Sequence, residues 1–143
     1  MGYNELMKVG IDITPVIYEG TGVGTYTREL VRHLLPLDEQ IHYTLFASTF
    51  RGQKKLWEYL KTLTASGNFS VKIYPFPPLV TEMAWNKFHK FTIEKFVGPV
   101  DVFHAWDWQQ PPAKTTKIVT TIHDLTTLKF PQSHSRKTVA VHQ

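Results

Sequence analysis

The sequence KVGIDIT at residues 8–14, followed by EGTGVGTYTREL at residues 19–30, decides the fold of this chain. The first stretch has the apolar character and length of a buried strand, and the second places three glycines ahead of a segment with helical spacing. Glycine gives the backbone access to positive φ, and the first N–H groups of a helix have no partner within it. Because the helix dipole is positive at this end, the junction is typical of a phosphate-binding site.

Strand and helix patterns alternate along the rest of the chain. Short apolar runs predict strands, and apolar residues spaced three or four apart predict helices. The expected strands are 8–14, 41–47, 70–74, 100–105 and 117–122, and the expected helices are 26–35, 56–63 and 80–97. Strands separated by helices favour right-handed crossovers. The sequence therefore predicts an α/β fold with a doubly wound, mostly parallel, Rossmann-like sheet.

The composition narrows the class of protein. The 143 residues fit one domain, and the lack of cysteine excludes thiolate catalysis, cysteine-ligated zinc and disulfides. The net charge is +4, but the basic residues are dispersed, so no nucleic-acid partner is expected. The sequence shows neither a signal-peptide pattern nor a run of about 18 apolar residues. The cytoplasm is therefore the expected location.

Polar and aromatic residues follow the last two expected strands. One strand ends in His104-Ala105-Trp106-Asp107-Trp108 and the other in His123-Asp124-Leu125. The carboxyl ends of parallel strands meet at one edge of a sheet, where ligands collect, so we expect these residues beside the glycine loop. Imidazoles, carboxylates and indoles supply hydrogen-bonding groups beside flat apolar faces. This mixture suits a sugar.

Each of these motifs also has a structural interpretation. The glycine loop can be a tight turn that serves backbone geometry, His104 can be a hydrogen-bonded structural residue, and Trp106 and Trp108 can pack in the interior. A metal site is not expected, because the spacing of the histidines and aspartates matches no ligand signature.

The dinucleotide-binding fingerprint G-x-G-x-x-G fits this loop badly. Its third glycine falls on Thr25 or Thr27, depending on where the count begins. The second expected strand continues into Ala47-Ser48-Thr49, without an acidic residue to hold a ribose. No Gly-Lys-Ser/Thr follows the loop, which excludes a P-loop. A domain of an NAD-dependent oxidoreductase is therefore the third choice.

Four motifs in order resemble the N-terminal domain of GT-B fold glycosyltransferases, particularly the mannosyltransferase-like, retaining family 4. They are Val9-Gly10-Ile11-Asp12, Gly22-Val23-Gly24-Thr25-Tyr26-Thr27-Arg28-Glu29-Leu30, Asp101-Val102-Phe103-His104-Ala105 and Thr120-Thr121-Ile122-His123-Asp124-Leu125. The resemblance spans nearly the whole chain from Lys8. Members of this family often carry a basic residue where this chain has Thr25, so no charge contact is expected from that position.

The resemblance implies a hexosyltransferase. It would move a hexose from a nucleotide-sugar to a sugar or glycolipid acceptor with retention, without a metal or other cofactor, in a cleft between two Rossmann-like domains. The implied contacts are Gly22, Val23 and Gly24 for the donor phosphate and sugar, His123 and Asp124 for catalysis, and His104, Trp106 and Asp107 for the acceptor. His123 would orient the transferred sugar, and Asp124 would shape the turn that holds it.

The resemblance also implies a domain organisation. Residues 1–7 would be a disordered leader, and residues 8–143 the acceptor-side domain, truncated before a C-terminal domain that binds most of the nucleotide-sugar. Such a fragment would be inactive alone. The alternative is a stand-alone flavodoxin-like ligand-binding or interaction module.

The segment 80–97 has two interpretations. Its aromatic residues are most simply part of the core. Together with Trp85, Lys87, Lys90 and Lys95 they could instead contact anionic lipid, which would place the protein peripherally at a membrane.

Overall fold

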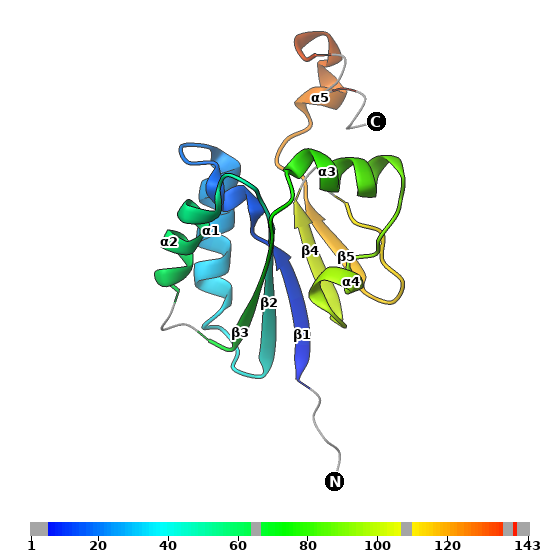
Figure 1. Cartoon of the computed structure of the whole chain (residues 1–143). Coiled ribbons are helices and arrows are strands. Elements are labelled where there is room, and N and C mark those ends of the chain that lie inside the picture. Colours follow the sequence, from blue (N-terminus) through cyan, green and yellow to red (C-terminus); the bar gives the residue numbers. More distant parts are fainter. Residues whose placement is uncertain (1–5, 64–66, 107–109, 136–138, 140–143) are drawn as a thin grey trace.

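The computed structural model describes residues 6–63, 67–106, 110–135 and 139. Within these residues, five parallel strands form one sheet with the order β3-β2-β1-β4-β5 (Figure 1). The strands are β1 (Met7–Asp12), β2 (Ile41–Ser48), β3 (Phe69–Tyr74), β4 (Val102–Trp106) and β5 (Lys117–Thr121). The strand order changes direction between β1 and β4, which is the switch point of a doubly wound sheet. The predicted Rossmann-like α/β fold is confirmed.

The register of the sheet brings three strand ends to one edge, at the top of Figure 1. Ile11 of β1 is the register partner of His104 in β4, and Trp106 in β4 is the partner of Thr121 in β5. Side chains that follow these pairs therefore meet at the carboxyl edge. This is the edge at which open α/β sheets bind ligands.

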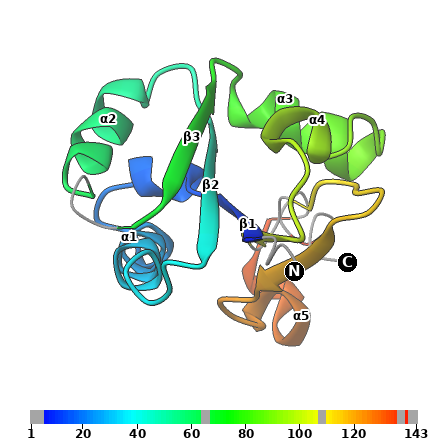
Figure 2. The ribbon, with the colours of Figure 1, turned by 90° about the horizontal axis from the view of Figure 1, so that it is seen from below.

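One face of the sheet is covered by η1 (Thr14–Ile17), α1 (Gly22–Leu34) and α2 (Gln53–Lys61) (Figures 1 and 2). Apolar residues four apart, such as Leu56 and Leu60 of α2, point inward because 3.6 residues make one turn. They pack with residues of β1 and β2, including Ile11 and Leu45, in one buried cluster. This buried cluster fixes the strands whose carboxyl ends form the candidate site.

The other face is covered by α3 (Pro78–Glu82), the π-helix η2 (Met83–Lys87) and α4 (Glu94–Val97) (Figure 2). The single helix expected over 80–97 is therefore wrong. His89 and Phe91 adopt positive φ, 47° and 62°, and interrupt it. A second core cluster lies under this layer and consists of Phe46, Trp85, Ile93, Val97, Val100, Phe103 and Ala105. The Trp85 indole is buried in it and donates to the carbonyl of Phe91 at 3.1 Å, which fixes the chain reversal.

The described part of the connection between β4 and β5, residues 110–116, contains no helix. The carboxylate of Glu94 holds it, because Oε1 accepts the amides of Lys114, Thr115 and Thr116 at 2.8–3.2 Å. Desolvation opposes ionisation of Glu94, but the hydrogen bonds outweigh it and hold its pKa well below the usual range. The connection thus packs directly onto the second core cluster, in which Ala113 takes part.

Two short elements follow β5: α5 (Thr126–Lys129) and η3 (Pro131–Ser133). They project from the carboxyl edge in Figure 1. In the described residues, no helix combines the length and apolar character needed to cross a bilayer. At the other end, β1 begins at Met7, one residue before the expected start, and residues 1–5 of the expected leader lie outside the described residues.

Candidate functional site

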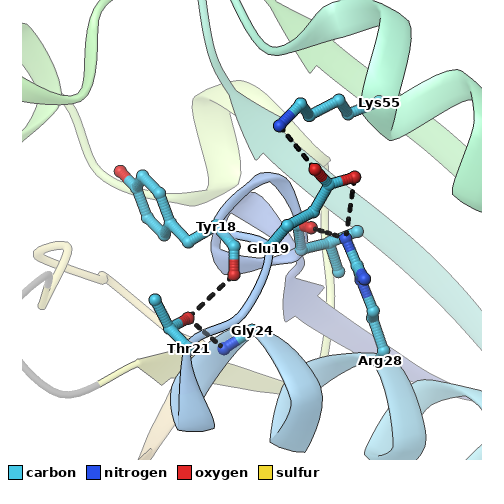
Figure 3. Close-up of polar contacts among 7 residues, drawn as sticks. Tyr18, Glu19, Thr21, Gly24, Arg28 and Lys55 are labelled. Atoms are coloured by element: carbon cyan, nitrogen blue, oxygen red, sulfur yellow. Dashed lines mark hydrogen bonds and ion pairs between the residues drawn. The ribbon is translucent and has the colours of Figure 1, made fainter.

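The side chain of Thr21 closes the loop that enters α1. Its hydroxyl donates to the carbonyl of Tyr18 at 2.8 Å and accepts the amide of Gly24 at 3.1 Å (Figure 3). This is an N-cap, in which a threonine satisfies one of the free amides of the first turn. For a phosphate to accept the Gly24 amide, as the sequence predicts, it would have to displace the Thr21 hydroxyl.

The two glycines of the first turn occupy different surroundings. A Cβ on Gly24 would lie 2.3 Å from the carbonyl oxygen of Tyr18, so the loop can pack here only on a glycine. A Cβ on Gly22 would meet nothing within 4 Å. Among the described residues, the amides of Gly22 and Val23 have no hydrogen-bond partner. These two N–H groups are the donors that the loop offers to a ligand.

Ionic contacts tie the preceding part of the loop to both helices of this layer. Glu19 accepts from Lys55 of α2 at 2.7 Å and lies 4.0 Å from Arg28 of α1 (Figure 3). Arg28 also donates to the carbonyl of Val16. The position of the first turn of α1 is therefore set by contacts on the side of the loop that faces α2.

The hydroxyl of Thr121 joins α1 to β4 at the carboxyl edge. It lies 3.1 Å from the Tyr26 hydroxyl and 2.8 Å from Nε2 of His104. The ring of His123 meets the Tyr26 ring edge to face, with centroids 5.0 Å apart. Tyr26, His104, Thr121 and His123, which we call the edge cluster, thus form one contact network.

The surroundings of His104 favour its neutral form. Burial lowers the pKa of His104, and the nearby His123 lowers it further. A neutral imidazole has one donor and one acceptor nitrogen. Nε2 is engaged with Thr121, which orients the ring. His104 can therefore be both structural, as its hydrogen bond shows, and a neighbour of a bound ligand.

A buried carboxyl group lies beside this cluster. Asp12, 2% exposed, ends β1, and its Oδ1 accepts the amide of Thr14 at 2.8 Å. Burial raises the pKa of Asp12 to about 6, against the opposing effect of hydrogen bonds from Thr14 and the Trp106 indole. Trp106 is only 6% exposed, and its ring lies 6.3 Å from that of Tyr18. Its burial favours the packing interpretation over an acceptor contact.

Asp124 shapes the turn after β5. Its Oδ1 accepts both the amide and the hydroxyl of Thr126, at 2.9 and 2.6 Å. This bonding pattern is the local side-chain-to-backbone turn that aspartate commonly forms. Asp107, the remaining predicted acceptor contact, lies outside the described residues together with Trp108.

Of the predicted site residues, His104 and His123 come together, and Tyr26 links them to α1, the helix whose first turn contains Gly22, Val23 and Gly24. Tyr26 and Thr121 were not predicted as site residues. The sequence contains a weak signal for each residue. Tyr26 lies four residues after Gly22 and therefore on the same face of the helix. Thr121 lies two residues after Val119 and therefore on the same face of its strand. Sheet order was needed to bring the two together.

Within the described residues, no group of three or more histidine, aspartate, glutamate or cysteine side chains is placed to hold a metal ion. In comparisons with known proteins, no protein family, no curated protein and no solved structure matched this chain.

Proposed function

We propose that this chain is the acceptor-side domain of a retaining, GT-B type hexosyltransferase and is inactive without a second, nucleotide-binding domain. One observation carries the proposal. The edge cluster, with two imidazoles and a tyrosine ring, includes Tyr26 of α1, one helical turn after Gly22, and among the described residues the Gly22 and Val23 amides have no hydrogen-bond partner. A sugar and a diphosphate need these two kinds of group side by side.

The chemistry of such an edge is electrostatic. Amides at a helix N-terminus stabilise negative charge, so Gly22 and Val23 would favour departure of the nucleoside diphosphate as its charge develops. The exposed part of Tyr26 offers an apolar ring face to a pyranose, and His123 offers a hydrogen bond to its hydroxyls. Asp124 would act indirectly, by fixing the turn that follows His123.

The second candidate is a stand-alone flavodoxin-like binding or interaction module. The internally capped loop favours it, since Thr21 and Gly24 satisfy each other without a ligand. An NAD-dependent oxidoreductase domain is less favoured. Where β2 ends, Ser48 donates to the carbonyl of Phe76 and Thr49 accepts the amide of Gly52, so neutral hydroxyls stand where a ribose-binding carboxylate is needed.

NMR titration of the isotopically labelled chain tests the proposal. We expect methyl hexosides to shift the imidazole signals of His104 and His123 with about millimolar affinity. His33, on the last turn of α1, and His42, at the far end of β2, are internal controls that should not move. Nucleoside diphosphate hexoses should bind weakly, because most of their contacts would lie in the second domain.

Two results of this titration would overturn the proposal. Micromolar binding of a free nucleotide or of NAD would contradict the assigned division between two domains. Hexoside-induced shifts at His33 or His42 without shifts in the edge cluster would place any sugar site elsewhere on the chain.

A further inference from the structure

The layer of α3, η2 and α4 carries a group of apolar side chains on its outside. They come from one continuous segment, residues 76–91, and each is between 40% and 54% exposed. The members are Phe76, Leu79, Val80, Met83, Phe88 and Phe91, which we call the 76–91 surface. Scattered exposed apolar residues are ordinary, but exposed apolar residues this dense in one short segment indicate an interaction site.

An apolar cavity of about 270 Å³ continues the 76–91 surface inward. Its lining runs from the exposed Phe76, Val80 and Phe91 to the fully buried Trp85. The surface that this open pocket exposes is apolar, so it offers water no hydrogen-bond partners and favours contact with hydrocarbon. The volume fits the end of a chain-like apolar group better than a whole small-molecule ligand.

Two lysines lie over rings of this surface, and a third, Lys90, belongs to the same segment of the chain. Lys87 lies over the ring of Phe88, with Nζ 5.7 Å from the centroid, and Lys95 lies over Phe91 at 5.4 Å. Among the described residues, neither these two nor Lys90 has an acidic partner within 4.0 Å. Of the two acidic residues in the layer, Glu94 is engaged by backbone amides and Glu82 is half-buried. The rim of the 76–91 surface is therefore open to negative charge.

The backbone that carries the 76–91 surface is strained at two residues. His89 and Phe91 both have positive φ, which costs a non-glycine residue roughly 1–3 kcal/mol. The π-helix η2 precedes them, and π-helical turns are common at functional sites. The result of this strained reversal is that Phe88 and Phe91 remain outside while Trp85 is buried.

We propose that the 76–91 surface docks onto an anionic bilayer, with its aromatic and aliphatic side chains at the level of the acyl chains and the three lysines on lipid phosphates. Apolar side chains flanked by lysines and arginines are the pattern of interfacial membrane segments. The cavity would admit hydrocarbon beside Val80. This inference does not depend on the proposed sugar chemistry, which lies at the carboxyl edge.

Vesicle flotation of the whole chain tests it. We expect binding to vesicles that contain phosphatidylglycerol, weakening with added salt, and little binding to pure phosphatidylcholine. Leu79→Ser combined with Phe88→Ser should reduce binding to anionic vesicles at least about tenfold. Trp57→Ser is the matched control, because Trp57 is 52% exposed on α2 in the other layer, and it should leave binding unchanged.

The lysines form a second arm of the experiment. Each of Lys87→Gln and Lys95→Gln should weaken anionic binding about fivefold and reduce its salt dependence. Lys54→Gln is the control, since Lys54 pairs with Glu58 on α2. Thermal unfolding of each variant shows whether it remains folded.

Three outcomes would overturn the inference: no binding of the wild-type chain to anionic vesicles, equal loss in the Trp57→Ser control, or binding of a monomeric fatty acid without vesicle binding. The last result would assign the cavity to a soluble acyl ligand.

Discussion

The loop that enters α1 and the segment that leaves β5 lie at the same edge of the sheet but are built differently. The loop is closed by its own hydrogen bonds, through Thr21 and Gly24. The segment has a short-range Asp124 turn and leaves Ile122 and Leu125 62% and 46% exposed. Within the closed loop, the two glycines of the first turn have separate roles. Gly24 serves packing, whereas Gly22 leaves space and an open amide.

The largest expected effect on the closed side of this comparison comes from Gly24→Ala. The new methyl group would lie 2.3 Å from the Tyr18 carbonyl oxygen, so the loop must move away from α1. We expect a loss of about 3 kcal/mol in the free energy of unfolding, the upper range for overpacking. Urea denaturation measures it.

Gly22→Ala is the matched control for that variant. It fills open space and should change the unfolding free energy by less than about 0.5 kcal/mol. Equal destabilisation by the two alanines would contradict the division of duties between these glycines.

The next largest expected effect is a pH dependence of the free energy of unfolding, and it comes from Asp12 at the end of β1. Its pKa rises from 3.8 to about 6 on folding, so the folded state binds more protons between these values. The contribution of Asp12 to the free energy of unfolding is therefore largest below pH 4. It decreases as the pH rises from 4 through 6, by about 3 kcal/mol in total.

Asp12→Asn keeps an acceptor for the Thr14 amide and removes the ionisation. The difference in unfolding free energy between wild type and this variant, measured by urea denaturation from pH 4 to 7, should therefore change in the variant's favour as pH rises. A difference that is independent of pH would show that Asp12 does not titrate in this way.

The Thr21 cap gives a smaller effect. Thr21→Ala removes the acceptor of the Gly24 amide and should cost about 1 kcal/mol. Thr21→Ser retains the hydroxyl and should cost much less. Thermal unfolding of the two variants checks the cap, and a serine variant as unstable as the alanine variant would argue against it.

The fold was predictable because its information is local. The alternation of apolar runs and helical spacing located all five strands, with ends within two residues of those observed. The helices differ more: α1 begins at Gly22, four residues before the expected start, and the largest difference is the layer over residues 76–97. Its aromatic spacing resembles a helix, but burial of Trp85 and the positive φ of His89 and Phe91 break the segment. Tertiary packing determines the structure of this region, and residue spacing alone does not reveal it.

The sequence predicts which residues lie at the same edge of the sheet, but it does not predict which of them are in contact. The sequence predicts that His104 and His123 lie together, because each comes at the carboxyl end of a parallel strand. The bridge through Tyr26 and Thr121 depends on β4 lying between β1 and β5 in a particular register. Likewise, burial of Trp106 follows from its place beside Tyr18, which no pattern of residue types reveals.

The open side of the comparison carries the central claim, that the first turn of α1 receives a diphosphate through its outward amides. Gly22→Pro tests it, because proline is well tolerated at the first position of a helix and Thr21 before it is already extended. The substitution deletes one N–H and should leave stability nearly unchanged. Gly22→Ala keeps the N–H and serves as the control.

The decisive measurement is titration of the three proteins with inorganic pyrophosphate, followed at the backbone amides of the first turn of α1. We predict shifts at Val23 in wild type and Gly22→Ala with equal affinity, and about tenfold weaker binding by Gly22→Pro, from loss of a hydrogen bond to a charged group. Equal affinity in all three proteins, or no response of this turn in wild type, would contradict the account.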